Sequence, residues 1–315
     1  MRCTVPAVSA LALAALLGLA RPPAAPAQPI LYVTNSGSGT VVFTTGGSTA
    51  STVASGFIIP SGLARDLAGN LYVAEAGGNK IDRVTTGGVV TTLAAVTNPG
   101  GLALDPLGLN LYAASGSGNA VVRVPLAGGA ATPFASGFNT PQGLAFDTGG
   151  NLYVANFNGN SVSKVAQDGT VSTFATGFSS PAGLAFDTGG NLYVANFNGR
   201  SLSKVTPAGA VSTFATLPLG ATPGGVAFDG ANLYVADSGN QVVDRVTLSG
   251  TVSGFAGGPL FQIPNYIVAV PVPEPGALLL VGAAAIAALA VRKRRITNAG
   301  GRCSGISKLR HPCAS

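Results

Sequence analysis

The chain has 315 residues, of which 45 are glycine and only 9% are charged, and its formal net charge at pH 7 is +6. Many glycines and few charges favour short strands and tight turns over helices. Between residues 28 and 270, however, eight basic residues are outnumbered by ten acidic ones, so this body carries −2 and the positive excess lies at the two ends. A slightly acidic body lacks the basic surface that binds phosphate backbones, which argues against a nucleic-acid partner.

Residues 1–27 have the features of a secretory signal peptide. Arg2 precedes an apolar stretch from Ala10 to Ala20, and Ala25-Pro26-Ala27 offers small residues for cleavage before Gln28. An uncleaved anchor helix is the alternative, although the apolar stretch is short for one. We therefore predict that the chain is exported. The body after Gln28 contains no cysteine up to residue 270, so no disulfide or thiolate metal site is expected in it.

From residue 30 to residue 270 the chain repeats with a period of about 40. Leu-Tyr recurs with the tyrosine at positions 32, 72, 112, 153, 193 and 234, and the fullest copies begin at Pro141 and Pro181. The copy from Pro141 predicts four strands, at 143–146, 152–155, 161–165 and 171–175, separated by turns rich in Asp, Asn and Gly. A 40-residue period of short strands predicts the blades of a β-propeller.

The number of blades follows from the first strands. Five complete units begin near Gly62, Gly101, Gly143, Gly183 and Gly225. The segment 30–57 lacks a first strand, and the segment 264–270 matches a first strand with no others after it. Joined, the two segments complete a sixth blade and protect the sheet edges that an open array would expose. We predict an all-β, six-bladed propeller closed by its N- and C-terminal strands.

The repeated pattern P-x-G-L-A-x-D…G-N-L-Y-V-A resembles the NHL repeat family over residues 30–270. It resembles more loosely the gluconolactonase-like and strictosidine-synthase-like six-bladed propellers. The resemblance implies the propeller fold, but these propellers include enzymes as well as binding modules, so it does not imply one activity.

A repeated aspartate follows each complete first strand. Because five copies are present, we interpret them as turn caps whose carboxylates accept backbone N–H groups, and not as catalytic residues. They are Asp66, Asp105, Asp147, Asp187 and Asp229.

A second set of polar residues ends each second strand, three positions after the repeated tyrosine. We expect these residues on the face where the links between blades lie, and we expect Asp237, Asn35 and Glu75 to lie in consecutive blades once the ring closes. Two carboxylates and several amide oxygens are ligands that Ca²⁺ prefers. The set therefore predicts a binding site for a hard cation such as Ca²⁺, with turn residues of a solvated rim as the alternative. Its members are Asn35, Glu75, Ser115, Asn156, Asn196 and Asp237, of which Ser115 is not a predicted ligand.

The familiar catalytic groups are missing from the repeats. The one histidine of the chain, His311, lies near the C-terminus, so the propeller contains neither histidine nor cysteine. This excludes Ser-His-Asp and Cys-His arrangements and His-ligated zinc there. It also argues against the virginiamycin-lyase and peptidyl-hydroxyglycine-lyase relatives, whose chemistry relies on histidine. No catalytic residue is assigned.

The C-terminal part holds an apolar run followed by a basic cluster. The run from Gly276 to Val291 would reach roughly 24 Å as a helix, against a hydrocarbon core of about 30 Å that snorkelling basic residues help it to cover. The basic cluster should remain cytoplasmic, which leaves the preceding propeller outside. The cluster consists of Arg292, Lys293, Arg294 and Arg295.

Pro273-Glu274-Pro275, the apolar run and the basic cluster together resemble the PEP-CTERM sorting signal. The resemblance implies that the protein is exported by a Gram-negative bacterium and is anchored in the inner membrane before processing. It also implies processing by an exosortase near Pro-Glu-Pro. A plain single-span anchor is the alternative. Residues 296–315 depart from the pattern, and they represent either an extended reading frame or a cytoplasmic tail.

These observations divide the chain into a signal peptide (1–27), a propeller (28–270), a sorting and transmembrane segment (271–295) and a tail expected to be disordered (296–315). We predict an exported scaffold, on the cell surface or in the extracellular matrix, that binds protein or carbohydrate. The alternative is a cation-dependent, lactonase-like hydrolase that holds Ca²⁺ at the polar set. A purely structural spacer is a third possibility.

Overall fold

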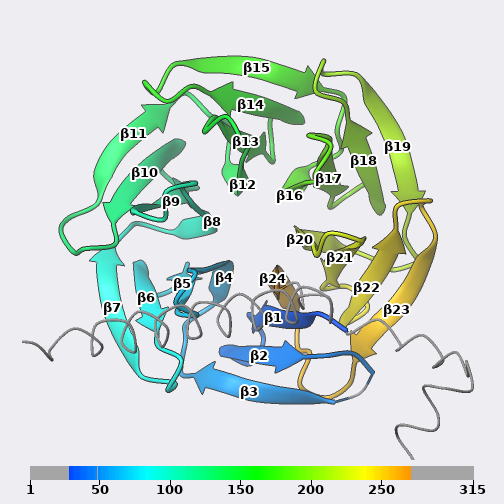
Figure 1. Cartoon of the computed structure of the whole chain (residues 1–315), viewed down its shortest axis with the longest axis horizontal. Coiled ribbons are helices and arrows are strands. Elements are labelled where there is room, and N and C mark those ends of the chain that lie inside the picture. The colour runs from blue at the N-terminus through cyan, green and yellow to red at the C-terminus, as the bar shows by residue number, and fades with distance from the viewer. Residues whose placement is uncertain (1–27, 48, 271–315) are drawn as a thin grey trace, which may run out of the picture. The chain divides into compact units, whose positions relative to one another are not determined.

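Twenty-four strands form six four-stranded antiparallel sheets arranged around a central axis (Figure 1). The computed structural model describes residues 28–47 and 49–270. The predicted signal peptide, sorting segment and tail lie outside these residues. We number the blades 1 to 6 in chain order, starting with the sheet that contains the N-terminal strands. The predicted fold class is confirmed.

The innermost strand of each blade lies nearest the axis and starts with a proline. These strands are β24 (Pro264–Val270), β4 (Pro60–Arg65), β8 (Pro99–Leu104), β12 (Pro141–Phe146), β16 (Pro181–Phe186) and β20 (Pro223–Phe228). The second strands contain the repeated tyrosine and are almost wholly buried. They are β1 (Ile30–Asn35), β5 (Leu71–Glu75), β9 (Asn110–Ser115), β13 (Leu152–Asn156), β17 (Leu192–Asn196) and β21 (Asn232–Asp237).

The third and fourth strands complete each blade toward the rim. The third strands are β2 (Thr40–Thr44), β6 (Lys80–Val84), β10 (Ala120–Pro125), β14 (Ser161–Val165), β18 (Ser201–Val205) and β22 (Val242–Thr247). The fourth strands are β3 (Ala50–Ser55), β7 (Val90–Ala95), β11 (Thr132–Ser136), β15 (Val171–Thr176), β19 (Val211–Thr216) and β23 (Val252–Gly257). The fourth strands alternate more and expose much of their length, as expected of an outer edge.

Blade 1 closes the ring as the sequence predicts. Its sheet has the order β24-β1-β2-β3, so the last strand of the propeller pairs with the first. The pairing is antiparallel, with Tyr32 opposite Val268 and Val33 opposite Ile267. In Figure 1 the end of the coloured chain meets its beginning at this sheet. The edge of β1 is thereby hydrogen-bonded and not open to other chains.

The glycine in the repeated P-x-G-L-A pattern has a packing role. A Cβ atom on Gly143 would collide with the backbone oxygen of Ala182 in the next blade, and one on Gly101 would collide with that of Gln142. Neighbouring first strands therefore approach backbone to backbone, which only glycine permits. The repeated glycine sets how closely the six blades pack around the axis.

Blade 1 breaks this glycine pattern with Tyr266. This tyrosine occupies the glycine position of β24 and is 8% exposed, and its hydroxyl lies where a Cβ on Gly101 of blade 3 would contact it at 3.1 Å. The side chain thus extends from blade 1 across the axis toward blade 3. Beside it, residues of all six first strands line an axial cavity of about 260 Å³, and they are apolar except for Arg65. Burial raises the pKa of Tyr266, so the hydroxyl stays neutral.

Between blades, aromatic side chains fill the interfaces. The Tyr153 ring packs edge to face against Phe174 of its own blade and Phe186 of the next, with centroids 4.9 and 5.0 Å apart. Tyr112 makes the same contacts with Phe134 and Phe146 at 4.8 and 5.1 Å. Such pairs add to the burial of the large rings. No helix long and apolar enough to cross a membrane occurs in the described residues.

Candidate functional site

The polar residues that end the second strands are all buried, and we call the six of them the polar ring. Their side chains are at most 7% exposed. The sequence placed them on the face of the links between blades, and hydrogen bonds to those links confirm this position. Glu75 Oε2 accepts from the N–H of Ile58 at 2.7 Å, and Asp237 Oδ1 accepts from that of Thr222 at 3.0 Å. The members of the polar ring are Asn35, Glu75, Ser115, Asn156, Asn196 and Asp237.

The two asparagines of blades 4 and 5 are hydrogen-bonded on both sides of the amide. Asn156 Oδ1 accepts from the N–H of Asn139 at 3.2 Å, and its Nδ2 donates to Ser163 Oγ on the third strand at 2.9 Å. Asn196 makes the equivalent bonds to Ser179 and Ser203, at 3.2 and 2.8 Å. These amides fix the link to the blade that follows it, so their role in the described structure is to hold the backbone.

Glu75 belongs to a buried charged cluster in blade 2. Lys80 Nζ lies 2.9 Å from Glu75 Oε1 and 2.7 Å from Asp82 Oδ2, and Thr92 Oγ1 donates to Asp82 Oδ1 at 2.8 Å. Burial and the adjacent Asp82 raise the pKa of Glu75. Burial opposes ionisation of Asp82 as well, but hydrogen bonds from Glu75 and Lys80 outweigh it and lower the Asp82 pKa. The lysine ammonium thus occupies the position between the two carboxyl groups where a cation would bind.

Asp237 and Asp244 form the corresponding acidic pair of blade 6. Asp237 accepts four hydrogen bonds, three from backbone N–H groups and one from Asn240 Nδ2 at 2.8 Å. Asp244, 3% exposed, has one buried oxygen without a hydrogen-bond partner. Burial, and then repulsion from Asp237, raise the pKa of Asp244 to about 6. Sequence reasoning missed Asp82 and Asp244. Their equivalence to Ser163 and Ser203 in the repeat alignment was the available signal.

Asn35 differs from the other ring residues. Its Nδ2 donates only a long bond of 3.4 Å to Thr40 Oγ1, and its buried Oδ1 has no hydrogen-bond partner. No recorded hydrogen bond joins one ring residue to another in the described part of the chain. Nor do residues 28–47 and 49–270 contain a group of three or more His, Cys, Asp or Glu side chains placed to hold a metal ion. The predicted metal site at Glu75, Asn35, Asp237, Asn156 and Asn196 therefore stays a prediction.

The repeated turn aspartates cap their turns, as the sequence predicts. Asp147 Oδ1 accepts from the N–H of Asn151, and Oδ2 accepts from Asn151 Nδ2, both at 2.8 Å. Asp147 Oδ2 also accepts from the Tyr153 hydroxyl at 3.3 Å. Burial opposes its charge, but these hydrogen bonds outweigh burial and lower the Asp147 pKa. The same hydroxyl bond joins Asp66 to Tyr72, Asp187 to Tyr193 and Asp229 to Tyr234.

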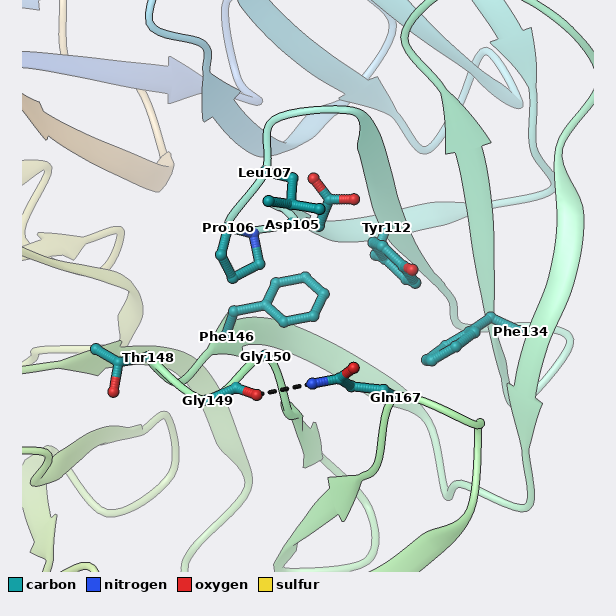
Figure 2. A pocket seen from close by; sticks show the side chains of 10 residues that line it. All are labelled: Asp105, Pro106, Leu107, Tyr112, Phe134, Phe146, Thr148, Gly149, Gly150 and Gln167. Atoms are coloured by element: carbon teal, nitrogen blue, oxygen red, sulfur yellow. Dashed lines mark hydrogen bonds between the residues drawn. The ribbon is translucent and has the colours of Figure 1, made fainter.

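Blade 3 lacks this tyrosine-to-aspartate bond, and a cleft of about 390 Å³ lies there between blades 3 and 4 (Figure 2). Its walls combine aromatic, aliphatic and polar groups. Figure 2 shows Phe146 between the Pro106–Leu107 turn on one side and the hydrogen bond from Gln167 Nε2 to the Gly149 carbonyl, 2.9 Å long, on the other. Nothing in the repeat pattern alone predicted this cleft. The remaining lining residues are Asp105, Tyr112, Phe134, Thr148 and Gly150.

Solved structures similar to this one are propellers of several activities. The nidogen/laminin complex matches with a TM-score of 0.69 and 20% identity, over 77% of this chain and 98% of that chain. A putative gluconolactonase matches with a TM-score of 0.61 and 20% identity, over 70% and 84%. Virginiamycin B lyase from Staphylococcus aureus, in a catalytically inactive His-to-Ala form with quinupristin, matches with a TM-score of 0.56 and 15% identity, over 73% and 85%. At these identities the likeness establishes the fold alone. No curated protein shows significant similarity to the chain.

Two family models match the sequence itself. The PEP-CTERM protein-sorting motif matches residues 271–295, so the resemblance of the C-terminal part is confirmed. The motif marks an exported protein that is sorted through a membrane-anchored stage in Gram-negative bacteria and processed by an exosortase. The NHL-repeat assignment stays a prediction.

The second family model corrects an expectation. The missing histidine argued against kinship with the virginiamycin lyases, yet the model described as the virginiamycin B lyase family matches residues 60–258, well over half of the chain. The expectation was wrong about kinship, since the matched residues span blades 2 to 6, which contain no histidine. The chain belongs to the virginiamycin B lyase family.

Proposed function

We propose that this protein is an exported propeller scaffold that binds a protein or carbohydrate ligand on the cell surface or in the extracellular matrix. The observation that carries the proposal is the internal use of the polar ring. Of its oxygen atoms, those of Glu75, Asn156, Asn196 and Asp237 already accept hydrogen bonds from the links between blades. Side chains that hold the backbone in this way are positioned for structure and not for chemistry, which leaves the propeller surface for binding.

The position of the one histidine supports a binding role over lyase activity. The inactive form of the Staphylococcus aureus enzyme carries alanine in place of one histidine. In the present chain the only histidine, His311, lies outside the propeller residues 28–270. We therefore expect incubation of the full chain with quinupristin to leave the compound intact, as followed by mass spectrometry. Cleavage that depends on the protein would overturn the assignment as a binding scaffold.

A glycan array and a pull-down from the extracellular fraction, both with the full chain, test the binding function directly. We expect specific retention of a glycan or a protein. A heat-unfolded sample of the same chain is the control for the array, because only the folded propeller should retain the ligand. Retention of nothing by the folded chain would favour the purely structural spacer.

A cation-dependent, lactonase-like hydrolase is the second candidate. The unpartnered Oδ1 of Asn35, in the blade between those of Asp237 and Glu75, favours it, because a buried amide oxygen is a suitable Ca²⁺ ligand. Lys80 and the four hydrogen bonds of Asp237 compete with such an ion. Calorimetry with Ca²⁺ distinguishes the candidates. Binding that Glu75→Ala abolishes and Asp187→Ala retains would support the hydrolase, and absence of binding would remove it.

A further inference from the structure

We propose that the cleft between blades 3 and 4 binds a neutral hexose unit of a glycan. This proposal rests on the proposed binding function and names both the ligand class and the place. It starts from a difference between blades. In blades 2, 4, 5 and 6 the repeated tyrosine donates its hydroxyl to the turn aspartate at 3.0 to 3.3 Å, and in blade 3 Tyr112 makes no such bond.

The difference follows from the length of one turn. Tyr153 follows Asp147 by six positions, whereas Tyr112 follows Asp105 by seven, because the turn Asp-Pro-Leu-Gly-Leu-Asn has one residue more than Asp-Thr-Gly-Gly-Asn. Asp105 still caps this turn, accepting from the N–H of Leu109 and from Asn110 Nδ2, both at 2.8 Å. Leu107, in this turn, is 80% exposed beside the cleft. The extra residue thus separates the aspartate from the tyrosine and leaves both groups facing the cleft.

The walls of the cleft suit a sugar. Phe134 and Phe146 supply aromatic surface for the C–H face of a pyranose ring, and Pro106 and Leu107 add aliphatic surface. Around them lie polar groups that bond to hydroxyls: the Asp105 carboxylate, the Tyr112 hydroxyl and the Gln167 amide. Each Asp105 oxygen accepts one bond within the turn and has a second lone pair to offer. A mostly apolar lining with a few convergent polar groups, in about 390 Å³, is typical of a small-ligand site.

The charges decide which kind of sugar fits. Asp105 is the one charged side chain among the lining residues, and it is acidic. A uronate or a phosphorylated sugar would bring a second negative charge next to Asp105. Arg123 lies outside the lining, opposite Tyr112 on the neighbouring strand and close to its hydroxyl, and it balances Asp105 without leaving a net positive charge that would attract an anion. A purely apolar ligand would bury the carboxylate, hydroxyl and amide without partners, which costs free energy. A neutral hexose satisfies these groups and avoids the repulsion.

Saturation-transfer NMR on the full chain tests the proposal with methyl glucoside, methyl galactoside, methyl mannoside and N-acetylglucosamine as probes, and methyl glucuronide as the anionic comparison. We expect saturable binding of at least one neutral probe, with a Kd on the order of 1 mM, and weaker binding of the glucuronide. Saturation by none of the neutral probes, or preference for the glucuronide, would overturn the proposal.

Paired variants locate the site. Phe146→Ala should weaken sugar binding about tenfold, which corresponds to the loss of one aromatic contact. Phe186→Ala is the matched control, because Phe186 packs on Tyr153 as Phe146 packs on Tyr112, at 5.0 and 5.1 Å, but beside a tyrosine that is bonded to its aspartate. It should leave sugar binding unchanged. If Phe146→Ala does not fold, Gln167→Ala, at an exposed position, replaces it.

The outcomes separate this proposal from the proposed function. Sugar binding that is weakened by Phe146→Ala or Gln167→Ala and not by Phe186→Ala supports both. A protein or glycan that the chain retains equally well with all three variants overturns the assignment to the cleft while the scaffold function stands. Retention of no ligand in any of the assays overturns both.

Discussion

The repeated aspartates and the residues of the polar ring both hydrogen-bond backbone groups, at opposite ends of the second strands. At one end a carboxylate such as Asp187 gathers the N–H groups of a turn and a tyrosine hydroxyl, and at the other end Asn196 joins the link between blades to the third strand. Each buried polar side chain is thus matched to backbone groups that would otherwise lack partners. Where the residue type changes from blade to blade, its partner on the third strand changes with it, as in Asn156 with Ser163 and Asp237 with Asp244.

Replacing a turn aspartate should destabilise its blade. Asp187→Ala removes hydrogen bonds to Asn191 and to the Tyr193 hydroxyl, and we expect the free energy of unfolding to fall by about 1–3 kcal/mol. Burial opposes the charge of Asp187, but its hydrogen bonds lower the pKa below the usual value of 3.8. The stabilisation should therefore be present above that value and disappear as the pH falls through the lower pKa of the folded state. Urea unfolding at pH 7 and pH 2.5 measures both effects.

Asp168→Ala is the control for this measurement, because Asp168 lies in an exposed turn and its carboxylate bonds only to Thr170 nearby. We expect a much smaller effect from it. Equal losses for Asp168→Ala and Asp187→Ala would mean that the tyrosine bond and the Asn191 bonds do not contribute as argued.

Asp244 should make stability decrease as the pH rises. Its folded-state pKa is raised from 3.8 to about 6, so the folded state binds the proton more tightly than the unfolded state does. The contribution of this group to stability is then highest below pH 3.8. It decreases between pH 4 and 6, because Asp244 is ionised in the unfolded state and still protonated in the folded state. Asp244→Asn removes the ionisation, so the variant should gain up to about 3 kcal/mol relative to the natural chain between pH 4 and pH 7. A difference between the two that does not change with pH, measured by urea unfolding, would contradict this account.

Two substitutions of Tyr266 should affect stability in opposite ways. Its buried hydroxyl has no hydrogen-bond partner, so Tyr266→Phe should leave the thermal unfolding midpoint unchanged or raise it. Tyr266→Gly restores the glycine of the other blades but empties the axis, and it should cost about 3–5 kcal/mol as other large-to-small core substitutions do. If Phe destabilised the protein as strongly as Gly, the hydroxyl would have a partner that this structure does not record.

At the scale of strands, the propeller depends on the pairing of β24 with β1. Five blades are built from consecutive strands, and the sixth is completed only when Pro264–Val270 pairs with Ile30–Asn35. Thr34 reinforces this pairing, since its buried hydroxyl accepts from the N–H of Tyr266 at 3.0 Å and donates to the Ser61 carbonyl of blade 2 at 2.9 Å. Thr34 therefore joins β1 to the closing strand on one side and to the neighbouring blade on the other.

Removal of the closing strand should convert the protein into an aggregating species. A chain that ends at residue 263 lacks β24, leaves the edge of β1 unpaired and empties the position of Tyr266. We expect it to elute in the void volume on size exclusion and to lose its cooperative unfolding transition. A chain that ends at residue 271 keeps all 24 strands and is the control. Monomeric, cooperative behaviour of the shorter chain would show that the ring is stable with an open blade.

For the whole molecule, the net charge of the propeller residues 28–270 differs in sign from that of the two ends. The formal charge of +6 belongs to the complete chain, while residues 28–270 carry −2. The basic residues Arg292 to Arg295 lie within the matched sorting motif, residues 271–295. The basic isoelectric point of the chain therefore comes from its two ends and not from the propeller residues 28–270.

Processing by an exosortase should depend on the Pro-Glu-Pro segment. Glu274→Ala changes the centre of this segment without altering the apolar run or the basic cluster. In a bacterium that has an exosortase, we expect the variant to stay in the membrane fraction at its unprocessed mass, while the natural chain is shortened. An immunoblot of the membrane and extracellular fractions gives the result. Glu75→Gln, within the propeller, is a control that should be processed normally, and equal processing of Glu274→Ala would contradict the prediction.

Most of the fold could be predicted from the sequence, because each blade repeats the same local pattern. The predicted strands 152–155 and 161–165 of the fourth blade correspond to β13 and β14, with one residue added to β13. The polar ring was also placed correctly at the links between blades. The repeat alignment could have indicated Asp82 and Asp244, which stand where blades 4 and 5 have serine. The ion pairs that Lys80 makes with two buried carboxylates depend on side-chain packing, which the repeat period does not specify.

The sequence by itself determined the number of blades, the way the ring closes and the C-terminal sorting motif, because these follow from periods, fragments and short motifs that are local in the chain. The tertiary structure decided how individual side chains are used. Tyr266 looks like one departure from a glycine pattern, and only the meeting of six first strands at the axis makes it the side chain that crosses the centre. Likewise, one extra residue after Asp105 becomes a cleft only when blade 4 places Phe146 and Gln167 beside it. The physical reason is that burial and convergence are properties of surfaces that meet in space, and a repeat along the chain does not contain them.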